Sequence, residues 1–346
     1  MMKYSLITKE IEKLAGIEND YENLIKDYSI KQGKKIVASS CFFIPPEINA
    51  AFDIVTLKIP EFILNKTGYS TKLTSLYNAI IIPEKECFCN KSVDQGIITH
   101  VFKTPAGFGE DAAVSLHNEI SLLLKSLFNI EIKSINIEAL QRETSIYEKL
   151  RRLVRSISSL RSENKSLLTN SELSLVFETA LILPPETAIE YITPLLEEMK
   201  KIDDKESGKL VTGMFYGGKN IPSAVADDIE ELGILIIEDD SCTGRRLFDI
   251  SLNADSEYIF YELLDAYSYR SLTPCLRPVN ERYELLYKLL RNYNIGTVIF
   301  YKDENCSESV KDIDYLRIKM MRDGIDPLVI DKNNYKEIVS DYLRRI

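Results

Sequence analysis

Apolar and polar residues follow two recurring patterns along this chain. Short runs rich in Ile, Val and Phe predict buried strands, and longer segments with apolar residues three or four positions apart predict helices packed on them. The predicted strands cover residues 35–43, 54–57, 77–83, 98–102, 209–215, 234–238, 296–302 and 326–331. One predicted helix begins near residue 45, and others cover residues 110–128, 137–161, 171–183, 186–201 and 222–232, the charged segment between 306 and 326, and the chain from about 334. This alternation is typical of an α/β fold with parallel sheets.

The predicted elements form two blocks, which meet at the polar segment 161–166, a predicted hinge. We therefore expect two Rossmann- or flavodoxin-like parallel-sheet domains with additional long helices, at residues 1–165 and 166–346. The helix over 137–161 carries an apolar stripe, which indicates core or inter-domain packing, and Asn136 is its predicted N-cap.

Composition narrows the class of protein. The 346 residues suit two domains of ordinary size, and 45% hydrophobic with 28% charged residues is typical of a globular protein. The formal net charge of −10 argues against nucleic acid as a partner. Apolar runs such as 79–82 are too short to cross a membrane, and the first ten residues lack signal-peptide features, so we expect a cytoplasmic protein. The basic run at 149–155 indicates a solvated helix face, or a contribution to an anion site.

The six cysteines are the main candidates for metal chemistry. No CxxC pair is present, and the closest pair is Cys87 and Cys89. Cys306 follows the predicted strand over 296–302, at the carboxyl end where open parallel sheets bind ligands. Buried thiols are the alternative interpretation for each cysteine, since disulfides are rare in the cytoplasm. Cys275 lies between two prolines, in a setting more typical of a structural residue.

Other polar residues lie at predicted strand ends or helix starts. Arg245 and Arg246 follow the strand over 234–238, and their guanidinium groups suit phosphates, although salt bridges to carboxylates are an equal alternative. Cys242 lies in the same loop and is either near a ligand or a semi-buried thiol. Ser40 ends the first strand, where its hydroxyl either reaches a ligand or only completes the strand. Glu47 is interpreted as a first-turn carboxylate favoured by the helix dipole.

Several segments together resemble the 2-hydroxyacyl-CoA dehydratase D-component family, which includes the benzoyl-CoA reductase B and C subunits. The most specific local match is residues 236–246, Ile-Ile-Glu-Asp-Asp-Ser-Cys-Thr-Gly-Arg-Arg. The other similar segments are residues 44–51, 77–83 with 89–91, 140–160, 298–306 and 324–331. Their order along the chain, more than any one segment, carries the resemblance.

The resemblance implies a lyase subunit with a cysteine-bound iron–sulfur cluster, of the [4Fe–4S] type, between two α/β domains. It implies a homo- or heterodimer with a related subunit, an ATP-dependent activator protein as electron donor, and anaerobic metabolism. One-electron reduction of a 2-hydroxyacyl-CoA thioester to a ketyl radical would precede loss of the 2-hydroxyl. Carried over to this chain, Cys306 and Cys89 would fill the last and the second cluster position, and Cys41 or Cys87 would substitute for the first. From their own positions in the sequence, Ser40 is the catalytic candidate, and Arg245 and Arg246 are the candidates for binding the acyl-CoA.

The chain also departs from the family pattern. The family's first cluster cysteine precedes its third strand, but residues 57–77 contain no cysteine, and Asn90 stands where aspartate is usual. Two hypotheses therefore remain open: a cluster-bearing dehydratase or acyl-CoA reductase subunit, and a non-catalytic, cluster-free paralogue or structural subunit. A dinucleotide-binding oxidoreductase is disfavoured, because no GxGxxG motif follows a predicted strand.

Overall fold

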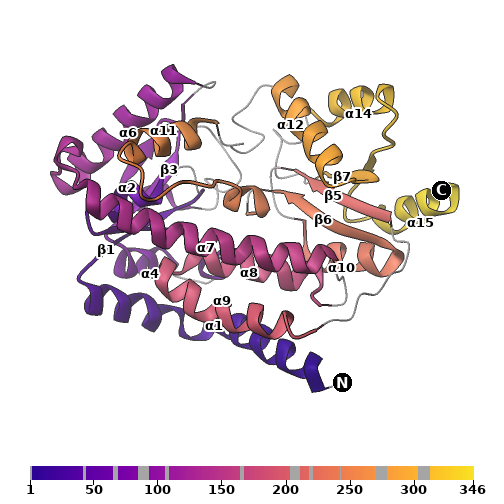
Figure 1. Ribbon diagram of the computed structural model, residues 1–346, viewed down its shortest axis with the longest axis horizontal. Coiled ribbons are helices and arrows are strands. Elements are labelled where there is room, and N and C mark those ends of the chain that lie inside the picture. Colours follow the sequence, from indigo (N-terminus) through magenta and orange to yellow (C-terminus); the bar gives the residue numbers. More distant parts are fainter. Residues whose placement is uncertain are drawn as a thin grey trace.

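A computed structural model describes most of the chain as two parallel sheets surrounded by helices (Figure 1). The described residues are 2–41, 44–64, 69–84, 93–105, 109–163, 167–202, 211–217, 221–241, 243–269, 279–302 and 312–346. The predicted α/β class with two parallel-sheet units is confirmed.

The first sheet has the strand order β2-β1-β3-β4, with every pair parallel. Its strands are β1 (Lys35–Ser39), β2 (Ile54–Lys58), β3 (Ala79–Pro83) and β4 (His100–Phe102). The central strands β1 and β3 pair from Val37 with Ala79 to Ser39 with Ile81. Four predicted strands are thereby confirmed, each slightly shorter or shifted at its ends.

The second sheet has the order β6-β5-β7-β8 and is also parallel throughout. Its strands are β5 (Val211–Tyr216), β6 (Ile234–Asp240), β7 (Thr297–Tyr301) and β8 (Leu328–Ile330). In both sheets the first strand in sequence lies between the second and the third. The strand order therefore reverses between β1 and β3 and again between β5 and β7, and ligands bind at the carboxyl ends of such switch points in open α/β sheets.

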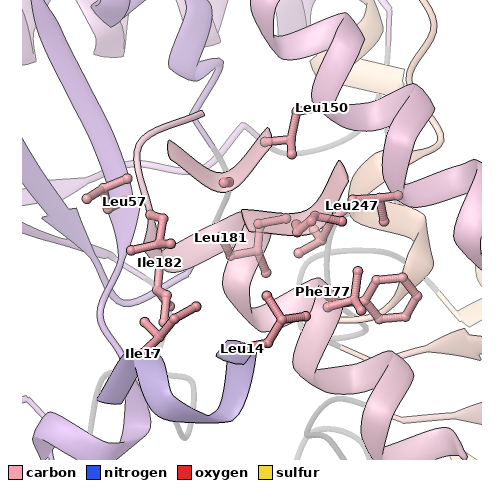
Figure 2. Close-up of a cluster of buried hydrophobic side chains, with 14 of the residues drawn as sticks. Leu14, Ile17, Leu57, Leu150, Phe177, Leu181, Ile182 and Leu247 are labelled. Atoms are coloured by element: carbon pink, nitrogen blue, oxygen red, sulfur yellow. The ribbon is translucent and has the colours of Figure 1, made fainter. Parts of the chain in front are cut away.

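Helices cover both faces of the first sheet. One face packs on α1 (Met2–Gln32), α7 (Ile137–Glu163), α8 (Asn170–Ile182) and α9 (Pro185–Met199) in an apolar cluster that Figure 2 shows in part. The other face packs on α6 (Glu110–Phe128) and α11 (Ile259–Tyr269). Successive side chains of a strand point to opposite faces of its sheet. In β1, Ile36 and Ala38 accordingly belong to the first cluster, and Val37 belongs to the second. The short elements here are α2 (Pro46–Ala50), α3 (Glu61–Leu64), α4 (Tyr69–Leu76), η1 (Gln95–Ile97) and η2 (Ile132–Ser134).

The second sheet is covered by α10 (Ser223–Leu232) and α15 (Tyr335–Arg345) on one face and by α12 (Val279–Asn292) and α14 (Ile313–Arg322) on the other. Between β6 and α12 the chain passes through η3 (Arg245–Phe248) to α11, which packs on α6 and α7 near the first sheet. After β6 the chain therefore returns to the helices around the first sheet before it completes the second sheet. The predicted boundary between residues 165 and 166 stays a prediction.

The long helix α7 contacts elements of both halves. It packs on α2, α8, α9 and α11 and also contacts η3 and β6 (Figure 1). Its predicted cap is present, because the Asn136 Oδ1 accepts a hydrogen bond from the Ala139 amide at 3.1 Å. Within the described ranges, no helix combines the length and apolar character needed to cross a membrane.

Candidate functional site

The carboxyl end of β1 forms a tightly bonded turn. The Ser39 hydroxyl donates to the Cys41 carbonyl oxygen at 2.6 Å, and the Ser40 amide donates to the Ile81 carbonyl oxygen of β3 at 3.1 Å. Ser40 and Cys41 are only 5% and 7% exposed. The turn is therefore fixed by backbone pairing at the switch point of the first sheet.

Cys41 is a buried thiol rather than half of a disulfide. It belongs to the apolar cluster that includes Ile44, Ile48 and Phe102 together with residues of α6 and α11. The other predicted ligands, Cys87, Cys89 and Cys306, lie outside the described residues, as do Cys242 and Cys275. Among the residues that the structure does describe, no three His, Cys, Asp or Glu side chains are grouped to hold a metal ion. The proposed ligand set stays a prediction.

The carboxyl end of β6 makes a second tight turn, within the segment that most resembles the family. The Asp239 carboxylate accepts a hydrogen bond from the Ser241 amide at 2.8 Å, and the Gly244 amide donates to the Ser241 carbonyl oxygen at 3.2 Å. A Cβ atom on Gly244 would lie 2.2 Å from the Asp239 carbonyl oxygen. The turn therefore has room only for glycine at this position.

Arg245 and Arg246 form ion pairs with carboxylates of β6. Arg245 pairs with Glu238, and its Nη2 donates to the Tyr293 hydroxyl at 2.7 Å. The Arg246 Nη1 lies 3.3 Å from the Asp240 Oδ1. The salt-bridge alternative is thus realised in this structure, and the binding of acyl-CoA phosphates by the same residues stays a prediction.

Burial shifts the acid–base properties of these carboxyl groups. It raises the pKa of Glu238 to about 8, and Arg245 opposes this rise without cancelling it. Burial likewise raises the pKa of Asp240 to about 6, against the opposing charge of Arg246, and raises that of Asp239. Carboxyl groups with strongly raised pKa values at a strand's carboxyl end are typical of functional sites, although structural ion pairs produce such shifts too.

Two further buried side chains, those of Tyr216 and Arg282, lie beside the carboxyl ends of β5 and β6. Tyr216 ends β5 directly beside Asp240 of β6, and burial raises the pKa of its hydroxyl. The Arg282 side chain of α12 lies 3.5 Å from that hydroxyl and pairs with Asp312 at the start of α14. Sequence patterns did not indicate Tyr216 or Arg282, because each looks like an ordinary residue of an amphipathic element.

A buried ion pair ties the first sheet's edge to α7. The Arg151 Nη1 lies 2.5 Å from the Glu47 Oε1, and its Nε donates to the Glu148 Oε1 at 2.9 Å. Glu47 is fully buried and Arg151 is 4% exposed. The expectation of a solvated face at 149–155 is wrong for Arg151, because its partner comes from α2, far away in sequence. It holds for Arg152, which is exposed.

The same face of α7 also holds the segment that follows η3. The Arg155 Nη1 donates to the carbonyl oxygens of Phe248 and Ile250 at 2.5 and 2.8 Å, and the Leu252 amide donates to Glu148 at 3.1 Å. Glu148 is therefore shared between Arg151 and the backbone after η3. Through these bonds α7 positions the chain that follows β1 and the chain that follows β6 relative to each other.

Two comparisons with known proteins bear on this arrangement. The family model for "2-hydroxyglutaryl-CoA dehydratase, D-component" matches residues 41–346. The "(R)-phenyllactyl-CoA dehydratase beta subunit" of Clostridium sporogenes is 20% identical over 229 residues, which cover 64% of this chain. The match spans 60% of the length of that relative.

Proposed function

Because the chain belongs to the 2-hydroxyglutaryl-CoA dehydratase D-component family, we propose that it is a subunit of a 2-hydroxyacyl-CoA dehydratase or related acyl-CoA reductase. In this proposal it holds an iron–sulfur cluster between its two sheet units and acts on a CoA thioester. One observation carries the proposal: cysteines follow three of the four strands that flank the two switch points. Cys41 follows β1, Cys87 and Cys89 follow β3, and Cys306 follows β7 in sequence.

Cys41, the one proposed ligand that the structure describes, has the chemistry that an iron–sulfur cluster needs. Cys41 offers a thiol, the usual ligand of iron–sulfur clusters, from a buried turn at a switch point. Cys87, Cys89 and Cys306 are the further proposed ligands. When bound, the cluster supplies single-electron chemistry to the thioester carbonyl, which leads to loss of the 2-hydroxyl.

The chain's own residues would bind and orient the substrate. Ser40 is fixed by its backbone bond to Ile81, so its hydroxyl would hold a thioester or 2-hydroxyl oxygen at a constant position. Arg245 and Arg246 would pair with CoA phosphates.

The partners in this proposal are an ATP-dependent activator protein, which would deliver the electron, and a related subunit with which the chain would pair. Family membership supports both. The buried position of Ser40 and Cys41 supports a site in which water is excluded from the reacting groups.

The test is the iron and acid-labile sulfide content of protein purified and reconstituted without oxygen. We expect about four iron atoms per chain, as in a [4Fe–4S] cluster, and their loss in Cys306→Ala and Cys41→Ala. Cys275→Ala is the matched control and should retain the iron. Iron-free protein after reconstitution would contradict the cluster proposal.

A second candidate function is a cluster-free paralogue or structural subunit of such a complex. The sequence feature that favours it is the lack of cysteine in residues 57–77, together with Asn90. The same experiment separates the two candidates, because a structural subunit would bind its partner subunit without holding iron.

A further inference from the structure

A groove of about 750 Å³ lies between α6 and α11, which pack against each other (Figure 1). The residues that line it recur along one stripe of each helix, and they include Glu110, Val114 and His117 of α6 and Tyr261, Leu264 and Asp265 of α11. Pockets of this size are typical of sites for small molecules. The proposed function assigns no ligand to this groove.

The walls of the groove are largely apolar and aromatic, and they are open to solvent. Tyr261 is 70% exposed and Val114 is 53% exposed, whereas Leu264 is buried. The Phe260 ring lies edge to face with the His117 ring at 5.9 Å between centroids and with the Tyr261 ring at 5.5 Å. The faces of aromatic rings attract ammonium groups, and their apolar surface packs on methylene chains.

The charge of the groove is negative. The carboxylates of Glu110, Glu262 and Asp265 line it, and no Lys or Arg is among the described lining residues. Glu110 and Asp265 are exposed, and Glu262 accepts a hydrogen bond from the Ser256 hydroxyl at 2.6 Å. An anionic ligand, such as a CoA phosphate, would meet like charges here. The groove therefore favours a cation.

The spacing of the carboxylates narrows the class of cation. Glu262 and Asp265 lie one helical turn apart, a spacing at which the Cβ atoms of a helix are separated by about 5–6 Å. Two ammonium groups joined by a short methylene chain span a similar distance. A bare metal ion fits less well, because the described residues include no group of three His, Cys, Asp or Glu side chains placed to hold one. It would also leave the apolar walls exposed to water.

We propose that the α6–α11 groove binds a linear aliphatic polyamine. The ammonium groups pair with the carboxylates of Glu110, Glu262 and Asp265, and charge-assisted hydrogen bonds of this kind are the strong ones. The methylene segments between them lie against Val114 and Tyr261. The inference rests on the composition of this groove alone, so it stands or falls separately from the presence of a cluster or the binding of acyl-CoA.

The test is isothermal titration of the full chain with spermidine at about 0.15 M salt, which screens weak binding to the acidic surface as a whole. We expect one saturable site per chain. Glu110→Gln/Asp265→Asn should raise the dissociation constant at least about tenfold, because two charged partners are lost. Tyr261→Ala leaves the net charge unchanged and should raise it about threefold through the lost aromatic contact. Butylamine, with a single ammonium group, should bind at least about tenfold more weakly than spermidine.

Glu337→Gln/Asp314→Asn is the matched control, since it removes the same two charges from exposed positions of α15 and α14, and it should leave the affinity for spermidine unchanged. Unchanged thermal unfolding would show that the variants fold, and Tyr261→Ala alters only an exposed side chain. The absence of saturable spermidine binding would overturn the proposal. Equal weakening by the groove and control variants, or displacement of spermidine by an equal concentration of Mg²⁺, would overturn it too, because either result would show binding to diffuse negative charge only.

Discussion

The guanidinium of Arg151 in α7 lies 2.5 Å from the fully buried carboxylate of Glu47 in α2. The pair joins residues that are 104 positions apart in sequence. Burial by itself lowers the pKa of Arg151, but Glu47, together with Tyr267 and Glu148, more than offsets this and holds the pKa above its usual range. Because α2 follows the Ser39–Cys41 turn, the pair fixes one side of the candidate site to the helix that contacts both halves of the chain.

Replacing Arg151 tests the importance of this pair for stability. Arg151→Met leaves Glu47 buried without its partner, so we expect a loss of about 3–5 kcal/mol in the free energy of unfolding. Urea unfolding measures the change. Arg152→Met is the control on the exposed neighbour, and it should stay within about 0.5 kcal/mol of the unaltered chain. Equal losses in the free energy of unfolding for the two variants would show that the buried pair contributes no more to stability than the exposed Arg152 does.

Gly244 tests the turn after β6. In Gly244→Ala the new methyl group would meet the Asp239 carbonyl oxygen, so the turn must shift. We expect a loss of about 1–3 kcal/mol in stability and, under the proposed function, weaker binding of CoA. Gly16→Ala is the matched control, because nothing lies within 4 Å of its added methyl group in α1. That change should stabilise the chain by about 0.5–1 kcal/mol.

Glu238 predicts a specific dependence of stability on pH. Burial raises its pKa from 4.5 to about 8 in the folded chain, so the folded state binds more protons than the unfolded state in that window. The contribution of Glu238 to stability is therefore present at low pH and is lost as the pH rises from about 4.5 to about 8. Glu238→Gln should remove this part of the slope, as measured by urea unfolding across the window. An identical slope in both proteins would contradict the raised pKa.

Arg246 tests the proposed acyl-CoA contact. Arg246→Met should weaken CoA binding about 10- to 100-fold, because a charge-assisted hydrogen bond contributes roughly 1.5–3 kcal/mol. Isothermal titration would measure the affinity. Arg291→Met is the control, since this exposed residue of α12 contacts Tyr287 and lies outside the candidate site. Equal affinities for both variants would exclude a role of Arg246 in holding the phosphates.

The local pattern of apolar and polar residues predicted most of the helices and strands. The predicted helix over 110–128 is present as α6 with the same bounds, and all eight strands were placed within a few residues. The helix α1 was missed although Ile7, Ile11, Leu14 and Tyr21 repeat at helical spacing, a signal that could have found it. The helices α11 and α12 were also missed, because the segment between β6 and β7 was interpreted only through the loop after β6 and through Cys275.

By itself, the sequence determined the class of fold, the positions of the strands and the placement of thiols and arginines after them, since these follow from local periodicity and order along the chain. Only the tertiary structure decided which charged residues are buried. Glu47 and Arg151 look like surface residues in sequence, and their burial depends on a partner brought close by the packing of α2 on α7. The burial of Glu238 and Asp240, which shifts their pKa values, likewise depends on how the chain folds over the edge strand β6. Desolvation and pairing act through space, and a linear pattern carries no record of them.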